Sequence, residues 1–513
     1  MDFTEQIQKG YTFKGQSIEI GAAMLNGEVA ADAKIYLPLR MMNRHGLIAG
    51  ATGSGKTKTL QTLAEQLSRH GTSVLLMDIK GDLSGIAAAG TNNDKIKERS
   101  QKIGIPFAPQ ANPVELLSLS DEPGVRLRAT ITEFGPILFS KILGLNDTQT
   151  GVLGVVFKYC DDNRLPLIDL KDLKKVLQFL SNEGAASIEA DYGKISTTSV
   201  GAIMRNIIAL EQQGADKFLG EISFDVQDLV RIDEEGKGYI SVLRLSDIQD
   251  KPMLFSTFML SLLAEIYASF PEKGDAEQPE LCIFIDEAHL IFSEASKALL
   301  DQLETIIKLI RSKGVGIYFC TQSPDDVPEA ILGQLGLKIQ HTLRAFTAKD
   351  RKAIKLAAQN FPESEFYDIE NLLTSLGIGE ALVTALSEKG TPTPLAHTML
   401  RAPESRMDVL TAAEMETIIN KSPLVRKYNK AIDSQSAYEM LTAKMQEAAK
   451  EEAAQEEEKT PKTKGGKEEK GFFENLMDST ITRQIGRTVA KEVTRGLMGV
   501  LGLGGRSSKK SWF

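Results

Sequence analysis

The chain has 513 residues, of which 42% are hydrophobic and 25% charged, and its formal net charge at pH 7 is −9. This length leaves room for about two to four domains, and the composition is that of an ordinary globular protein with a substantial core. The acidic balance excludes a surface that binds nucleic acid over its whole area. Any such binding must therefore be local.

The sequence carries no sign of export, membrane insertion or disulfide bonding. Its three cysteines, Cys160, Cys282 and Cys320, lie in apolar surroundings without a C-x-x-C pair, which predicts buried, reduced thiols. The N-terminus lacks a basic segment followed by an apolar one, and no run reaches the ~18 apolar residues of a membrane span. We therefore expect a cytoplasmic protein.

Taken in chain order, the first elements predict a small β-rich segment followed by an α/β core. Residues 1–40 contain short alternating runs, KGQSIEIG and AKIYLPL, separated by turn residues. From 41 to 84 the pattern changes to a buried strand at Leu47-Ile48, a helix closed by Gly71, and a second apolar strand that ends on Asp78. This alternation indicates the first part of a core with parallel strands.

The loop between the first core strand and its helix fits the phosphate-binding template G-x-x-x-x-G-K-[ST] at every fixed position. Its glycines let backbone N–H groups turn toward a phosphate, and the helix N-terminus adds partial positive charge. Lys56 is predicted to reach the outer phosphates of ATP, and the Thr57 hydroxyl to bind Mg²⁺. The predicted nucleotide-binding residues are Gly50, Ala51, Thr52, Gly53, Ser54, Gly55, Lys56, Thr57 and Thr59.

Residues 85–235 have a different character, with helical spacing of apolar residues in segments such as TGVLGVVFKYC and LKDLKKVLQFLSN. We predict a mostly helical insertion over this range. The second part of the core then follows over 236–405, beginning with the strand GYISVLRL and a largely buried helix, MLFSTFMLSLLAEIYASF.

The second decisive stretch of the core is Leu281–Ile285 followed by Asp286 and Glu287. Five apolar residues predict a buried parallel strand, whose carboxyl end is where ligands bind in open α/β sheets. There Asp286 would hold Mg²⁺, and Glu287 would orient and deprotonate the attacking water. The alternative is a strand that ends in a helix cap. The phosphate-binding loop upstream favours the catalytic interpretation, while His289 is as well explained by packing.

The spacing of apolar residues also predicts the remaining elements of the core. A strand over 316–320 precedes Gln322, whose amide could sense the γ-phosphate or could simply begin a loop. A strand over 337–343 precedes Arg344, and a helix over 349–359 and a hairpin-like pair, EALVTAL and LAHTMLR, would complete the sheet.

After residue 405 the pattern predicts C-terminal helices over 406–446, a charged linker over 447–470 that is disordered or a frayed helix, and a tail over 471–513. Within the tail, apolar and basic residues each recur every four positions on opposite sides of a helix over 481–497. Such a helix could bind an acidic membrane surface or nucleic acid. It could equally pack on this protein or on a neighbouring subunit.

The motifs RHGLIAGATGSGKT, LLMDIKGD, IFIDEAH, IRSKGVGIYFCTQSP and LGIGEALV together resemble the HerA/FtsK branch of RecA-like P-loop ATPases. More closely, they resemble an uncharacterised bacterial family of HerA-like ATPases or helicases. The resemblance covers about residues 15 to 405. It implies an α/β, RecA-like fold, in which helices flank a mainly parallel central sheet, here with a helical insertion and a helical C-terminal tail.

The resemblance also implies a function: homo-hexameric rings that hydrolyse ATP between subunits and move double-stranded DNA. In such a ring Lys56, Glu287 and Gln322 would act on their own subunit's nucleotide, and Arg311 would be supplied to the neighbour's site in trans. Arg344 is a second candidate for an arginine of this kind.

This chain departs from the resembled pattern at several places. Its N-terminal part is shorter than the barrel with which HerA docks a nuclease, the insertion lacks a basic stripe with interleaved aromatics, and the charged linker and basic tail are additions. Two other functions therefore stay open: an ATP-driven protein-assembly or secretion motor tethered through the 481–497 helix, and a nucleotide switch. A superfamily 2 helicase is disfavoured because over two hundred residues separate the two nucleotide motifs.

Overall fold

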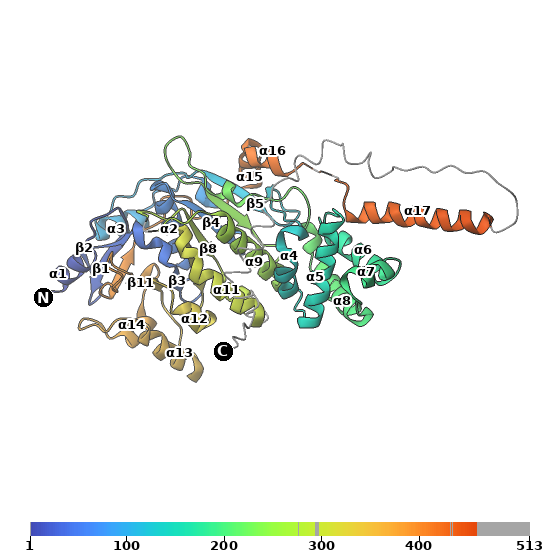
Figure 1. Cartoon of the computed structure of the whole chain (residues 1–513). Coiled ribbons are helices and arrows are strands. Elements are labelled where there is room, and N and C mark those ends of the chain that lie inside the picture. The colour runs from blue at the N-terminus through green and yellow to red at the C-terminus, as the bar shows by residue number, and fades with distance from the viewer. Residues whose placement is uncertain (1, 275, 293–296, 431, 433, 459–513) are drawn as a thin grey trace, which may run out of the picture. The chain divides into compact units, whose positions relative to one another are not determined.

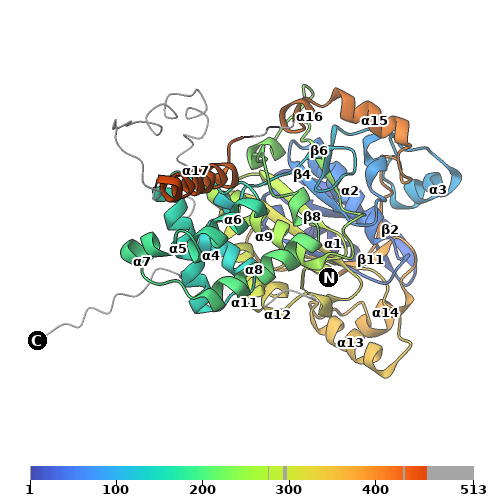
Figure 2. The ribbon, with the colours of Figure 1, turned by 90° about the vertical axis from the view of Figure 1, so that its right-hand side faces the viewer.

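The computed structural model describes residues 2–274, 276–292, 297–430, 432 and 434–458. The chain forms two compact units (Figures 1 and 2). One, the sheet unit, contains the described residues within 1–127 and 224–430, and the other, the helical unit, contains 128–223 and the described residues after 430. The predicted basic helix over 481–497 lies outside the described residues.

The sheet unit is built on one sheet of twelve strands in the order β2-β1-β12-β11-β10-β3-β9-β8-β4-β7-β5-β6. The strands are β1 Ser17–Leu25, β2 Glu28–Pro38, β3 Gly46–Ala49, β4 Ser73–Asp78, β5 Val114–Ser118, β6 Val125–Arg126, β7 Ile240–Arg244, β8 Leu281–Ile285, β9 Val315–Thr321, β10 Leu337–Gln340, β11 Glu380–Thr384 and β12 Ala396–Leu400.

The sheet has a parallel part and an antiparallel part. All neighbouring pairs from β10 through β3, β9, β8, β4, β7 and β5 to β6 are parallel. The pairs that join β10, β11, β12, β1 and β2 are antiparallel. The mainly parallel α/β sheet predicted from the sequence is therefore confirmed, and the predicted N-terminal strands and the hairpin-like pair extend it at one edge.

The core of the sheet unit lies on both faces of the parallel strands. Leu60, Leu63 and Leu67 of α2 (Lys56–Arg69) are fully buried in one cluster with alternate strand residues such as Phe284 and Tyr318. Those two rings stack with their centroids 4.6 Å apart. Residues of the opposite parity are buried as well, as expected for strands with helices on both sides. On that second face α11 (Lys297–Ile310) contacts β9.

The sheet unit contains further α-helices. They are α1 Phe3–Gly10, α3 Asp94–Ile103, α9 Pro252–Ser269, α10 His289–Phe292, α12 Glu329–Leu332, α13 Ala348–Gln359, α14 Ile369–Ser375, α15 Ala412–Lys421 and α16 Pro423–Tyr428. α1 has no counterpart in the sequence-based prediction. Asp2 caps it, and the Phe3 ring packs edge-on against Phe366, with centroids 5.2 Å apart.

The helical unit contains α4 Ile131–Ile142, α5 Asp147–Asp162, α6 Leu170–Ser181, α7 Ala185–Tyr192, α8 Thr197–Gln212 and α17 Ala437–Glu458. Within it α4 packs on α5, α5 and α6 on α8, and α17 on α6 (Figure 1). Asp172 of α6 accepts a hydrogen bond from the Tyr438 N–H of α17, 2.8 Å away. None of the described helices is both long and apolar enough to cross a membrane.

The helical region is narrower than the predicted range of 85–235, because the residues before 128 contribute β5 and β6 to the sheet. Part of the predicted charged linker also has a defined conformation: α17 continues to Glu458. The three cysteines are buried free thiols, as the sequence predicted.

Candidate active site

Backbone hydrogen bonds join the phosphate-binding loop to the carboxyl ends of β9 and β10, the two strands that flank β3 in the sheet. The Gly50 N–H donates to the Thr321 carbonyl of β9 (3.2 Å), and the Ala51 N–H donates to the Thr342 carbonyl just after β10 (2.8 Å). Gly50 has φ +153°, and a Cβ there would lie 2.5 Å from the Cβ of His341. The first position of the loop therefore requires glycine for space as well as for backbone conformation.

Lys56 begins α2 and is buried beneath the loop. Its ammonium donates to the carbonyl oxygens of Gly50 (2.7 Å) and Ala51 (3.2 Å). Burial lowers the pKa of Lys56, and the positive charge of Lys80 lowers it further, against the opposing effect of Glu287 and Asp286. The ammonium is thus held in the fold of the loop at the helix N-terminus, where phosphate groups bind.

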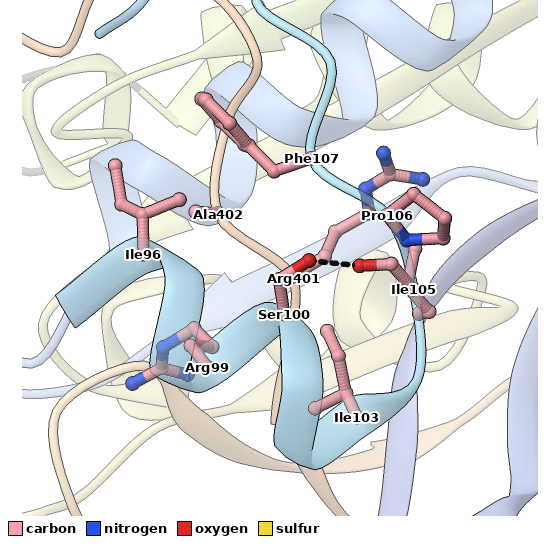
Figure 3. Close-up of a pocket in the computed structure, with 9 residues that line it drawn as sticks. All are labelled: Ile96, Arg99, Ser100, Ile103, Ile105, Pro106, Phe107, Arg401 and Ala402. Carbon is pink, nitrogen blue, oxygen red and sulfur yellow. Dashed lines mark hydrogen bonds between the residues drawn. The ribbon is translucent and has the colours of Figure 1, made fainter. Parts of the chain in front are cut away.

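A second layer supports the loop from outside. The Gly379 N–H donates to the Ser54 carbonyl (3.0 Å), and Arg99 of α3 donates to the carbonyl oxygens of Gly379 (3.1 Å), Ile378 (2.9 Å) and Leu400 (2.9 Å). Arg99 also lines the small pocket beside α3 in Figure 3. That pocket is lined by Ile96, Arg99, Ser100, Ile103, Ile105, Pro106, Phe107, Arg401 and Ala402.

The Thr59 hydroxyl, predicted as part of the nucleotide site, contacts His341 and the backbone of the loop instead. Its oxygen lies 2.9 Å from His341 Nε2 and 3.3 Å from the Gly55 carbonyl. Burial lowers the pKa of His341 to about 4, and the charge of Lys56 acts in the same direction, so the ring is neutral at pH 7. Thr59 therefore holds the start of α2 against a neutral imidazole.

Asp286 and Glu287 follow β8, which is separated from the loop strand β3 by β9 alone. Because these strands are parallel, the loop and the acid pair lie at the same edge of the sheet. The charges of both acids act on Lys56, in agreement with this placement. The structure thus brings together the two motifs that the sequence predicted to share a site.

The two acids differ in their electrostatic surroundings. Burial raises the pKa of Asp286, which the charge of Lys80 only partly offsets. At Glu287 burial also acts to raise the pKa, but the hydrogen bond and positive charge of Lys80 outweigh it, so that the pKa of Glu287 is lowered. Glu287 has φ +47°, and its Oε2 lies 3.2 Å from His289 Nδ1. Glu287 is therefore a carboxylate at pH 7 and chemically able to accept a proton.

The site has oxygen donors of the kind that Mg²⁺ prefers. Asp286 Oδ2 and the Ser54 hydroxyl are buried without a hydrogen-bond partner in the described part of the chain, and Thr57 lies in the first turn of α2. Carboxylate and hydroxyl oxygens beside bound phosphates are the usual magnesium ligands, so these residues fit the ion. Among the described residues there is no cluster of three or more His, Cys, Asp or Glu side chains suited to another metal.

The other predicted catalytic residues, Gln322, Arg344 and Arg311, lie at different distances from the loop. Gln322 follows the carboxyl end of β9, beside the loop, and is exposed. Arg344 is exposed too, and donates to the Thr52 carbonyl of its own chain's loop (3.2 Å). Arg311 follows α11 and precedes β9, so it lies at the opposite end of that strand. Seven residues of strand separate it from the loop edge, or roughly 23 Å.

Four residues of the site had no motif of their own in the sequence. Lys80 stands in the quoted run LLMDIKGD, and Gly379 in LGIGEALV, but neither spacing reveals a partner. His341 contacts Thr59, and Arg99 supports the loop through Gly379. Both relationships arise from tertiary packing, since each residue lies tens to hundreds of residues from the loop. Gly379 has φ +74°, a backbone conformation that favours glycine. Of these features, this is the one that the glycine in the sequence run could have suggested.

Comparison with known proteins agrees with this geometry. The family model for the helicase HerA-like C-terminal region matches residues 24–508. A DNA double-strand break repair helicase HerA of Sulfurisphaera tokodaii is 24% identical over 369 residues, which are 71% of this chain and 66% of that protein. The protein of the same name from Saccharolobus solfataricus is 22% identical over 387 residues, 74% and 68% of the two chains. The chain spans about two thirds of these relatives.

Solved structures show the same fold at low sequence identity. The unbound bacterial conjugative coupling protein TrwBdeltaN70 has a TM-score of 0.51 and 14% identity, and the match covers 80% of this chain and 94% of that one. The plasmid coupling protein TrwB in complex with the non-hydrolysable GTP analogue GDPNP has a TM-score of 0.50 and 15% identity, covering 78% and 99%.

The family match extends over nearly the whole chain, which includes the loop, the acid pair and the strands of the sheet that carry them. The chain belongs to the helicase HerA-like C-terminal family and is a P-loop ATPase of the HerA/FtsK type.

Proposed function

We propose that this protein is a Mg²⁺-dependent ATP hydrolase that works as a homo-hexameric ring and couples hydrolysis to movement along double-stranded DNA. The observation that carries the proposal is the placement of the Asp286 and Glu287 pair at the same sheet edge as the Lys56 loop. A phosphate-binding loop alone would support nucleotide binding. A buried carboxylate that is ionised beside it supports hydrolysis as well.

In this proposal each residue has a separate task. The loop and Lys56 bind the phosphates, Thr57 and Asp286 hold Mg²⁺, and Glu287 accepts a proton from the attacking water. Bound Mg²⁺ would supply positive charge that neutralises the phosphate oxygens. Gln322 stands at the end of β9, where an amide can respond to the presence of the γ-phosphate.

The position of Arg311 supports a site shared between subunits. It lies at the opposite end of β9 from its own loop, too far to reach a nucleotide bound there. Closed rings of head-to-tail subunits bring such opposite surfaces together, so that Arg311 would neutralise charge in the neighbour's site. Arg344 already contacts its own loop and would act in cis.

DNA as the substrate rests on the relatives, which are described as DNA double-strand break repair helicases. The overall charge of −9 requires the contact to be local, such as basic residues facing a ring channel.

The first experiment measures phosphate release and binding of a fluorescent ATP analogue by the full-length protein. Glu287→Gln should bind nucleotide and lose turnover, and Lys56→Ala should bind weakly. Glu98→Gln, which removes an exposed carboxylate that pairs with Lys102 on α3, is the matched control and should behave as wild type. Normal turnover in both site variants would refute the assignment.

A second experiment identifies the substrate. The ATPase rate is measured with linear double-stranded DNA and with anionic liposomes, for the full chain and for a chain truncated after residue 470. Stimulation by DNA that survives truncation supports translocation. Stimulation by liposomes that is lost on truncation would instead identify the tethered protein-assembly or secretion motor, and no response to either would indicate a nucleotide switch.

A further inference from the structure

Lys80 is a residue of this site for which the catalytic roles above leave no task. It stands just after β4, in a turn held by the Asp78 carboxylate, which accepts hydrogen bonds from the N–H groups of Gly81 (2.7 Å), Asp82 (3.1 Å) and Leu83 (3.1 Å). Gly81 has φ +76°, which closes the turn. These hydrogen bonds fix the backbone of the turn, and with it the position from which the Lys80 side chain extends.

The Lys80 ammonium contacts both acids of the site. It forms an ion pair with Glu287 Oε1, and it lies 3.7 Å from Asp286 Oδ2. The side chain of Lys80 is 38% exposed, whereas those of Asp286 and Glu287 are 2% and 10% exposed. Of the three groups, only the lysine can turn into water without a large loss of buried contacts, because its stem is long and flexible.

The contacts of Lys80 are also the oxygens that the proposed reaction requires. Mg²⁺ would take Asp286, and the attacking water would take Glu287. A Mg²⁺ ion held by Asp286 would repel the Lys80 ammonium beside it, and a carboxylate that is hydrogen-bonded to an ammonium is a weaker base than a free one. Lys80 and the loaded metal therefore compete for the same pair of acids.

We propose that Lys80 is an exchangeable counter-cation of the acid pair: it holds Glu287 while the pair lacks a metal, and Mg²⁺ with bound nucleotide displaces it and so releases Glu287 to accept the proton. This inference rests on the proposed function of the site. It makes Lys80 a positioning residue, which acts on the reaction through Glu287. Loading of the site and activation of the base then become a single event, which protects a partly loaded site from water attack.

The test measures Mg²⁺ dependence of nucleotide binding, which does not require turnover. Fluorescent ADP analogue is held at a fixed concentration with the full-length protein, and Mg²⁺ is titrated. In Lys80→Met the Mg²⁺ concentration for half-maximal binding should fall roughly three- to tenfold, since the competing charge is gone. Lys80→Arg, which keeps the charge, should stay close to wild type. Lys80→Gln should repeat the methionine result if Lys80→Met unfolds at a lower temperature.

Lys58→Met is the matched control for a general loss of positive charge. Lys58 and Lys80 both interact with Asp82, but the Lys58 ammonium bonds to the Met407 carbonyl and to Gln61 Oε1 (3.4 Å) rather than to the acid pair. An equal shift in Lys58→Met would overturn the inference, as would an unchanged or higher Mg²⁺ requirement in Lys80→Met.

The Glu287→Gln background gives a second readout. Because Lys80 then has a neutral partner, the effect of Lys80→Met on the Mg²⁺ midpoint should shrink in the double variant. If the two substitutions instead shift the Mg²⁺ midpoint independently, so that their effects add, the proposed displacement of Lys80 by Mg²⁺ would be contradicted. Failure of this inference differs from failure of the proposed function: in the first case wild type binds the analogue with Mg²⁺ and Lys80→Met does not shift the midpoint, and in the second the Lys56→Ala variant binds as well as wild type.

Discussion

The backbone N–H of Gly379 donates a hydrogen bond to the Ser54 carbonyl across 3.0 Å. This bond joins the phosphate-binding loop to the segment before β11, on the antiparallel side of the sheet. Gly379 in turn is held by Arg99, whose guanidinium bridges the carbonyl oxygens of Ile378, Gly379 and Leu400. The shape of the nucleotide loop thus depends on residues far from it in sequence.

Replacing Arg99 by Gln should loosen this support. Loss of charged hydrogen bonds to three carbonyl groups is expected to cost about 2 kcal/mol of unfolding free energy and to weaken nucleotide binding several-fold. Fluorescent-nucleotide titration and thermal unfolding measure the two effects. Lys97→Gln, which changes an exposed lysine of the same helix that pairs with Asp94, should change neither, and equal affinities for Arg99→Gln and wild type would contradict the idea.

Two glycines of the loop provide a comparison between crowding and backbone strain. Gly50→Ala would place a Cβ 2.5 Å from His341 Cβ at φ +153°, whereas Gly53→Ala would have nothing within 4 Å at φ +81°. The Gly53 change is expected to cost about 1 kcal/mol from the left-handed backbone, and the Gly50 change roughly 1–3 kcal/mol more from overpacking. Chemical denaturation of the two variants should show this order; similar costs would mean that the His341 contact relaxes freely.

The buried ring of His45 should make the free energy of unfolding depend on pH. The ring bonds through Nε2 to the Ile307 carbonyl (2.8 Å) and through Nδ1 to the Ile317 N–H (3.0 Å). Burial lowers the pKa of His45 to about 4, although the bond to Ile307 opposes it, and the nearby Arg311 and Arg44 charges lower it further. In the unfolded chain the pKa returns to about 6.5.

Because the folded pKa of His45 is the lower one, its stabilising contribution is present above about pH 6.5 and is lost as the pH falls toward 4. The full loss amounts to about 3 kcal/mol. Denaturant midpoints at pH 7.0, 5.5 and 4.5 should therefore fall more steeply in wild type than in His45→Gln. Parallel profiles for the two proteins would show that the ring is not held neutral.

The two arginines should differ when subunits are mixed, if the ring model holds. Arg311→Ala retains an intact Glu287, and a Glu287→Gln subunit can supply the missing arginine, so a mixture should regain part of the ATPase rate that either variant lacks alone. Arg344→Ala should not be rescued in this way, because Arg344 contacts its own loop. Rescue of Arg344→Ala, or none for Arg311→Ala, would argue against the assigned sides of the interface.

The parts of the site that follow from local sequence could be predicted well. The run Leu281–Ile285 is apolar at every position and only five residues long, which favours a strand buried on both faces, and the acids after it fall at its carboxyl end. The loop of Lys56 needs no tertiary information, because its glycines and helix start are contiguous.

What the sequence could not provide depends on pairings between distant residues. β5 joins the sheet only by lying parallel to β7, more than a hundred residues later, and its five residues carry no signal of that partner. Lys80 likewise is an ordinary turn lysine until the sheet places it beside Glu287. Long-range parallel pairing is decided by the whole sheet, and no local pattern encodes it.

The division of the chain has a mechanical consequence for anything attached to its C-terminal part. The chain passes between the two units after residues 127, 223 and 430, and α17 packs on α6 within the helical unit. A load applied beyond Glu458, by an anchor or a cargo, would therefore pull first on α17, and so on the helical unit in which α17 packs. The contact between α17 and α6 would then be the first in the described part of the chain to bear such a force.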